Sequence, residues 1–297
     1  MKNLKTMKML FGILALFTAH VAQAKPYVVT TLPNFADLAR KIGGANVEVK
    51  SLIGTGIDPH FVPAKPTFLV DLNKADLLIS VGAKLEAGWL PTLIRQSGNN
   101  KIKVGSEGSL DLSQAVSLME VATGKVSRAM GDVHPSGNPH YFLSPAYVPA
   151  MARAIAVHLA KIDPSNASLY SSNLANFTSS WNAKAAGWKS RLNKGSVTVV
   201  SYHRSLSYLL AWAGWTVFDT IEAKPGIPPS SARLSELIET LPKNGVKVIL
   251  SERWYSAKDS RFLSEKTGIP LVLIDGLTND YTAYFEALVN ALAGAIK

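Results

Sequence analysis

The sequence contains no cysteine among its 297 residues. The protein therefore forms no disulfide, binds no metal through thiolate, and lacks the residue through which exported bacterial proteins are lipid-anchored. Long apolar runs are also scarce. The longest, Met9 to Phe17, belongs to a stretch of about ten residues, whereas a membrane span needs roughly 20. The phosphate-binding Gly-x-x-x-x-Gly-Lys loop and the His-Glu-x-x-His zinc-protease motif are missing as well, so neither ATP hydrolysis nor that protease chemistry is indicated.

The first 24 residues have the pattern of a secretory signal. Lys2, Lys5 and Lys8 precede the apolar stretch, and the segment Ala22-Gln23-Ala24 offers small residues where a signal peptidase cuts. Cleavage after Ala24 would leave 297 minus 24, or 273 residues. We expect a soluble periplasmic protein without a lipid anchor.

Basic residues outnumber acidic ones, but they do not cluster. The formal charge of +10 falls to +7 when the three signal lysines are removed. The remaining lysines are scattered, and no basic run alternates with aromatic residues as nucleic-acid-binding surfaces require. We therefore expect no nucleic-acid partner, and we expect a monomer.

The mature chain reads as two similar halves in which short β-branched runs alternate with helical patterns. Such alternation predicts an α/β fold of two doubly wound parallel-sheet lobes. The predicted strands are Tyr27 to Thr31, Val47 to Leu52, Leu77 to Val81, Ile102 to Val104, Val197 to Ser201, Thr216 to Phe218, Val246 to Ser251 and Pro270 to Leu273. The predicted helices are Phe35 to Ile42, Thr67 to Asn73, Leu85 to Gln96, Tyr147 to Lys161, Leu206 to Ala213, Ala232 to Leu241, Lys258 to Thr267 and Tyr281 to Ile296.

One long helix is predicted between the halves, from Pro164 to Asn193, because apolar residues recur there mostly at spacings of three and four. At about 28 residues it would be roughly 40 Å long and would act as a rigid strut. We divide the chain into signal 1–24, N-terminal lobe 25–163, connecting helix 164–194 and C-terminal lobe 195–297.

Three histidines and one aspartate lie in loops beside predicted elements. His60 and His140 each follow a proline, while His203 and Asp275 each follow a strand of the second half. Ligands of open parallel sheets bind beyond the carboxyl ends of the strands, so the four groups can meet in the cleft between the lobes. Three imidazoles and a carboxylate are a suitable donor set for tetrahedral zinc.

Short motifs around these residues resemble the substrate-binding proteins of zinc or manganese ABC importers, a group of periplasmic proteins sometimes called cluster A-I. The resemblance covers essentially the whole mature chain. The motifs are Asp58-Pro59-His60-Phe61-Val62-Pro63, Leu72-Asn73-Lys74-Ala75-Asp76-Leu77, Asn138-Pro139-His140-Tyr141-Phe142-Leu143-Ser144-Pro145, Ser201-Tyr202-His203, Pro229-Ser230 and Leu250-Ser251-Glu252.

The resemblance implies that His60, His140, His203 and Asp275 are the metal ligands and that Glu252 accepts a hydrogen bond from an imidazole. It also implies delivery to a membrane permease with a cytoplasmic ATPase; a periplasmic metallochaperone could load the site. The histidine-rich loop of many zinc-specific members is replaced by Met130 to Asn138, in which His134 is a candidate accessory ligand.

Zinc is the favoured cargo because imidazole suits zinc, whereas manganese prefers more oxygen donors. A manganese or broad-specificity receptor is the alternative of the same type. Two other classes share parts of the pattern: a zinc-dependent hydrolase, in which Glu252 would act as the base, and a receptor for a metal chelate such as a siderophore.

Overall fold

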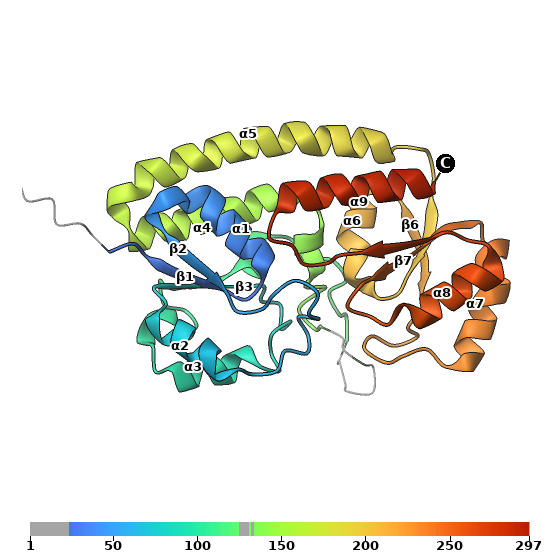
Figure 1. Cartoon of the computed structure of the whole chain (residues 1–297), viewed down its shortest axis with the longest axis horizontal. Helices are drawn as coiled ribbons and strands as arrows, with labels where there is room; N and C mark the ends of the chain where they lie inside the picture. The colour runs from blue at the N-terminus through green and yellow to red at the C-terminus, as the bar shows by residue number, and fades with distance from the viewer. Residues whose placement is uncertain (1–23, 125–130, 132–133, 297) are drawn as a thin grey trace, which may run out of the picture.

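The computed structural model describes residues 24–124, 131 and 134–296, so the predicted signal lies outside the described residues except for Ala24. Two lobes stand side by side beneath one long helix (Figure 1). Each lobe is built on a four-stranded parallel sheet. The two-lobe α/β fold predicted from the sequence is confirmed.

The first lobe has the strand order β2-β1-β3-β4, and every pair of neighbouring strands is parallel. The central strands β1 and β3 are apolar and largely buried, because helices cover both faces of the sheet, whereas the edge strand β2 is partly exposed. The elements are β1 (Tyr27–Thr30), α1 (Pro33–Gly43), β2 (Glu48–Ser51), α2 (Pro66–Lys74), β3 (Leu77–Ser80), α3 (Leu90–Ser97), β4 (Ser109–Asp111) and α4 (Val148–Ile162).

The second lobe repeats this arrangement with the order β6-β5-β7-β8. In both lobes the first strand lies inside the sheet, between the second and the third, so both sheets have the same point at which the strand order reverses. The elements are β5 (Thr198–Ser201), α6 (Ser207–Ala213), β6 (Thr216–Thr220), α7 (Ser231–Lys243), β7 (Val246–Glu252), α8 (Ala257–Thr267), β8 (Leu271–Ile274) and α9 (Tyr281–Ala295).

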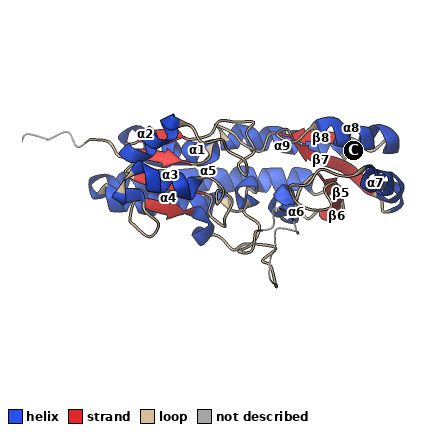
Figure 2. Ribbon diagram, turned by 90° about the horizontal axis from the view of Figure 1, so that it is seen from below, coloured by secondary structure: helices blue, strands red, loops and turns tan. Residues whose placement is uncertain are grey.

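The connecting helix α5 (Ala167–Leu192) has 26 residues and is therefore about 39 Å long. Its apolar stripe is anchored by tryptophans: Trp181 donates to the carbonyl of Pro145 over 2.9 Å, and Trp188 donates to Glu286 over 2.7 Å. Because Pro145 lies in the first lobe and Glu286 on α9 of the second, α5 is fixed to both lobes (Figure 1). Figure 2 shows the two sets of strands at opposite ends of the molecule.

Two predicted elements of the first lobe are wrong. Ile102 to Val104 is not a strand, since Val104 is 89% exposed, and the fourth strand forms at Ser109–Asp111 instead. The helix predicted from Leu85 begins only at Leu90. The N-cap residue Trp89 still has a non-helical φ of −136°, and Pro91 stands in the first turn, where its fixed φ favours the start of a helix.

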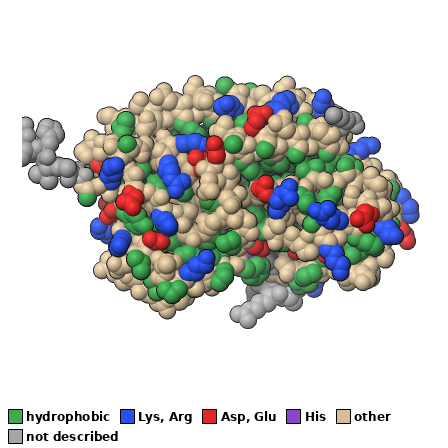
Figure 3. All heavy atoms as spheres, viewed as in Figure 1, with side chains coloured by type: hydrophobic (Ala, Val, Ile, Leu, Met, Phe, Trp, Pro, Cys, Tyr) green, Lys and Arg blue, Asp and Glu red, His purple; other side chains and the backbone are tan. Residues whose placement is uncertain are grey.

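Basic and acidic side chains are interspersed over the face seen in Figure 3. Within the part of the chain that the structure describes, no helix has both the length and the apolar character needed to cross a bilayer.

Candidate metal centre

Three of the predicted ligands meet between the lobes, where His140 and His203 line a pocket. One ring nitrogen each of His60, His140 and His203 lies within 4.8 Å of the others. The rings are 5.0, 5.6 and 5.4 Å apart between centroids, and the residues are only 9%, 1% and 4% exposed. In the described part of the chain this is the one group of three or more histidine or acidic side chains spaced to hold a metal ion.

The two first-lobe histidines are oriented in the same way, by the side chain two residues before each of them. In Asp58-Pro59-His60, Oδ1 of Asp58 accepts from the backbone N–H of His60 over 3.0 Å and contacts its ring Nδ1 at 2.7 Å. In Asn138-Pro139-His140 the corresponding distances from Asn138 are 2.9 and 2.8 Å. Proline fixes φ between the two residues. Each loop therefore orients its own imidazole, and Asp58 holds its loop by the hydrogen bond to the backbone of His60.

His203 obtains its orientation from a different strand. It follows β5, and its Nδ1 lies 2.9 Å from Oε2 of Glu222, just beyond β6. The same oxygen accepts from the backbone N–H of Gly226 over 3.1 Å. All three rings thus have an oxygen acceptor at Nδ1, which leaves the lone pair of a neutral ring on Nε2. This is the arrangement in which proteins present histidine to a metal.

Burial and charge keep the site ready for a cation. Burial, assisted by the neighbouring histidines, holds the pKa of His140 well below its usual value, so this ring is neutral. Burial also lowers the pKa of His203, but the hydrogen bond and charge of Glu222 outweigh it and the net shift is upward. The pKa of Asp58 shifts downward overall: burial raises it, but the hydrogen bonds and charge of His60 lower it by more. Two carboxylates, Asp58 and Glu222, therefore contact the imidazoles and favour positive charge at the site.

Asp275 does not join the histidines in this structure. Its side chain is 69% exposed, and its Oδ1 lies 3.0 Å from Nε of Arg253 in a separate hollow against α9. The reason is the strand order: β8, which precedes Asp275, is separated from β5 by β7. Two strand spacings amount to about 10 Å, so the prediction that all four groups meet is wrong for the conformation seen here.

Glu252 lies close to the site but has a different contact from the one predicted. It is fully buried, and one of its carboxylate oxygens accepts from the hydroxyl of Ser205. Burial raises the pKa of Glu252 to about 7. Among the described residues, Oε2 has no hydrogen-bond partner. The imidazole N–H that Glu252 was predicted to accept is taken by Glu222 instead.

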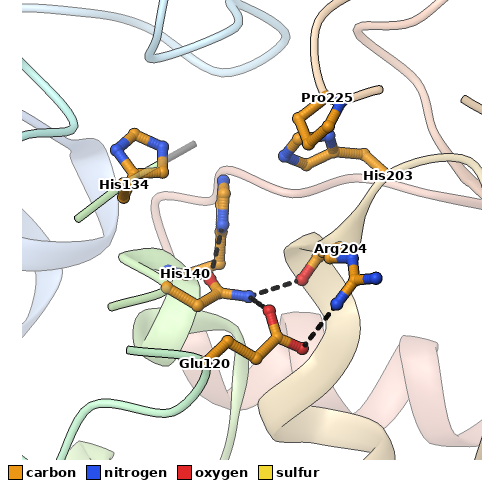
Figure 4. A pocket seen from close by; sticks show the side chains of 7 residues that line it. Glu120, His134, His140, His203, Arg204 and Pro225 are labelled. Carbon is orange, nitrogen blue, oxygen red and sulfur yellow. Dashed lines mark hydrogen bonds and ion pairs between the residues drawn. The ribbon is translucent and has the colours of Figure 1, made fainter. Parts of the chain in front are cut away.

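His134 lines the same pocket. Its ring centroid is 5.5 Å from that of His60 and 6.3 Å from that of His140 (Figure 4). Asp132 and Val133, which precede it, lie outside the described residues. The other lining residues are Glu120, Asn138, Arg204 and Pro225.

Two residues beside the histidines had no place in the sequence prediction. Glu222 follows β6 by two positions, so an acidic residue at the carboxyl end of a parallel strand was the available signal. Glu120 lies in an irregular segment between the lobes' elements and carried no such signal, although it contacts Asn138 directly.

Three buried imidazoles suit zinc and the later transition metals. Known proteins resemble this chain over most of its length. A family model described as zinc-uptake complex component A, periplasmic, matches residues 28–295. The solved structure named ZnuA superimposes with a TM-score of 0.78 at 25% identity, covering 92% of this chain and all of that one.

Two curated relatives carry different metals in their names. The zinc-binding lipoprotein AdcA of Streptococcus pneumoniae is 24% identical over 281 residues, which is 93% of this chain but 55% of AdcA. The manganese ABC transporter substrate-binding lipoprotein PsaA, also of Streptococcus pneumoniae, is 24% identical over 278 residues, covering 89% of this chain and 84% of PsaA.

Proposed function

The chain belongs to the family of periplasmic zinc-uptake components A, and on this premise we propose that it captures zinc at His60, His140 and His203 for delivery to an ABC importer. The observation that supports this best is the convergence of three buried imidazoles, each with an oxygen acceptor at Nδ1. A cation entering the pocket exchanges its water for three Nε2 atoms that are already oriented. Preorganised ligands lose less conformational entropy on binding.

Zinc is favoured over manganese by the donor set. The three converging donors are nitrogens, and zinc takes imidazole more readily than manganese, which prefers oxygen. Because one relative is named for manganese, a receptor of broader metal specificity is the alternative. A competition experiment with zinc and manganese distinguishes the two possibilities.

For the fourth ligand of the loaded site we propose Asp275, as the sequence motif implies. In the structure its carboxylate is bound to Arg253, so ligation requires the loop after β8 to move toward the pocket. An exposed ion pair of this kind is worth about 0 to 1 kcal/mol, so it opposes such a movement only weakly. Metal binding would therefore draw the loop after β8, which carries Asp275, toward the three histidines.

Substrate-binding proteins of this family act in transport together with a permease and an ATPase. We place this chain in the periplasm after removal of residues 1–24 and assign the mature lobes to 25–163 and 195–297, joined by 164–194. The family membership argues against the hydrolase, and the narrow histidine pocket argues against a bulky chelate.

The test is metal content after competition. The mature protein is stripped with a chelator, dialysed against equimolar zinc and manganese, and analysed for both metals. We expect one zinc per chain and little manganese, and severe loss of zinc in H60A, H140A and H203A. H158A is the matched control, because His158 lies on α4 and contacts only its own helix at the carbonyl of Ala154 among the hydrogen bonds described. Full zinc retention by the three variants would refute the site.

A further inference from the structure

Glu120 bridges the two lobes at the edge of the histidine pocket. Its Oε2 accepts from Nδ2 of Asn138 over 3.0 Å, and its Oε1 accepts from the hydroxyl of Ser207 over 2.8 Å. Oε1 also lies 3.8 Å from Nη1 of Arg204. Asn138 precedes the first-lobe ligand His140, while Arg204 and Ser207 follow the second-lobe ligand His203. Figure 4 shows Glu120 with its contact to Arg204.

The amide of Asn138 has its orientation fixed by these contacts. Its Nδ2 donates to Glu120 and, over 2.8 Å, to the carbonyl of Arg204. Its Oδ1 accepts from the backbone and the ring of His140. Rotating the amide by 180° would place a donor against donors and an acceptor against acceptors. The imidazole of His140 is consequently held with its proton on Nδ1.

The equivalent position before His60 is occupied by a different residue. Asp58 can only accept hydrogen bonds, so it needs no partner to define which atom faces the ring. Asn138 could present either end of its amide. The backbone N–H of His140, the Arg204 carbonyl and Glu120 together decide that Oδ1 faces the ring of His140.

A second pair of hydrogen bonds joins the segments around Met119 and Asn138 to the second lobe. The hydroxyl of Tyr208, on α6, donates to the carbonyl of Asn138 over 2.6 Å and accepts from the backbone N–H of Met119 over 2.8 Å. Glu120 itself has a positive φ of 54°, which a residue with a side chain adopts only when its surroundings hold it. The segment carrying Glu120 is thus built into the junction between His140 and His203.

We propose that Glu120 is a positioning residue of the metal site: through Asn138 it fixes the tautomer of His140, and through Ser207 and Arg204 it holds that ring in register with His203. This inference rests on the proposed role of the two histidines as zinc ligands. Groups that orient a metal ligand change metal affinity by about 10- to 100-fold when replaced. We expect the loss to appear mainly as faster zinc release, because the ligands themselves remain.

A cycle of two substitutions tests this, with zinc affinity and zinc release measured at pH 8. N138D retains the acceptor for His140 but sets a second carboxylate against Glu120, and it should weaken zinc binding by about 10- to 100-fold. E120Q alone should have a smaller effect, since glutamine can still accept from Asn138. In the double variant N138D/E120Q the glutamine amide donates to the new carboxylate and should restore part of the lost affinity. Restoration is partial because the Arg204 carbonyl still loses its donor.

Two further measurements separate positioning from general stability. Nitrogen-15 NMR of the imidazoles should show His140 protonated at Nδ1 in the wild-type protein and a mixture of tautomers in E120A. E239Q, at an exposed glutamate of α7, is the matched control for loss of charge and should leave zinc binding unchanged.

The outcomes distinguish this inference from the proposed function. Zinc binding by the wild-type protein together with equal affinity in N138D, or no recovery in the double variant, would overturn the role of Glu120 alone. Absence of zinc binding by the wild-type protein would overturn the zinc site itself.

Discussion

Glu222 offers the sharpest prediction about metal affinity. Its Oε2 contacts Nδ1 of His203 at 2.9 Å, and the two side chains are only 4% and 5% exposed. Because that oxygen also accepts from Gly226, the glutamine of E222Q can preserve both contacts with its single carbonyl oxygen. E222Q therefore removes the negative charge and little else, whereas E222A also leaves two donors without their acceptor.

The magnitude follows from this difference. Replacing a group that orients a metal ligand costs about 10- to 100-fold in affinity, or about 1.4 to 2.8 kcal/mol. We expect E222Q near the tenfold end and E222A near the hundredfold end. Glu222 also raises the pKa of His203 against the effect of burial. Its loss lowers that pKa, so protons compete less and the gap between E222Q and the wild-type protein should narrow as the pH falls toward 6.

Competition titration against a chelating dye, at pH 8 and at pH 6, measures these differences. Circular dichroism confirms that each variant is folded, and E236Q on the exposed face of α7 controls for removal of one charge. If E222A bound zinc as tightly as the wild-type protein at pH 8, the contact between Glu222 and His203 would have no role in binding.

Three further predictions follow from the pKa shifts and the loop positions. Zinc affinity should fall as the pH drops through the raised pKa of His203, starting above pH 6.5. Because His140 is already neutral, binding should release about one proton per zinc. Calorimetry in buffers of different ionisation enthalpy measures the number of protons released. Burial raises the pKa of Glu86 from 4.5 to about 7, so its contribution to stability is greatest below 4.5 and is lost as the pH rises to 7. E86A should lower the free energy of unfolding by about 2 to 4 kcal/mol, measured in urea, because three buried donors lose their acceptor. D275N should reduce zinc affinity about tenfold and leave the melting temperature unchanged, because the ion pair it loses is exposed.

Each of these predictions has its own contrary result. Release of no proton near neutral pH would show that His203 is not the group that competes with zinc. Stability of E86A equal to wild type at pH 5 would show that the carboxyl group of Glu86 does not hold its loop. Unchanged zinc affinity in D275N would leave the three histidines with a fourth ligand other than Asp275.

The sequence predicted the fold because its signals are local. Apolar runs bounded by helical patterns define the parallel strands, and seven of the eight predicted strands have counterparts in the structure. The exception, Ile102 to Val104, has only one residue to bury, and Gly105 turns the chain before β4 forms. A segment of three residues with a lysine between two apolar side chains carries too little pattern to separate a strand from a turn.

The three histidines were predictable from two signals: the proline-containing motifs around His60 and His140, and the end of a strand for His203. His203 follows β5, so its place at the edge of the sheet was expected. Which acidic side chain contacts His203 depends on the strand order β6-β5-β7-β8. The local sequence pattern does not predict that order. Glu222 follows the neighbour β6 and reaches the imidazole, whereas Asp275 follows β8, one strand too far.

The central claim is that zinc binds where the three histidines meet. A crystal of the zinc-loaded mature protein, measured on both sides of the zinc absorption edge, locates the ion directly. The account predicts one anomalous peak about 2.0 to 2.1 Å from Nε2 of His60, His140 and His203. A peak elsewhere in the molecule, or zinc bound through Nδ1 of these rings, would contradict it.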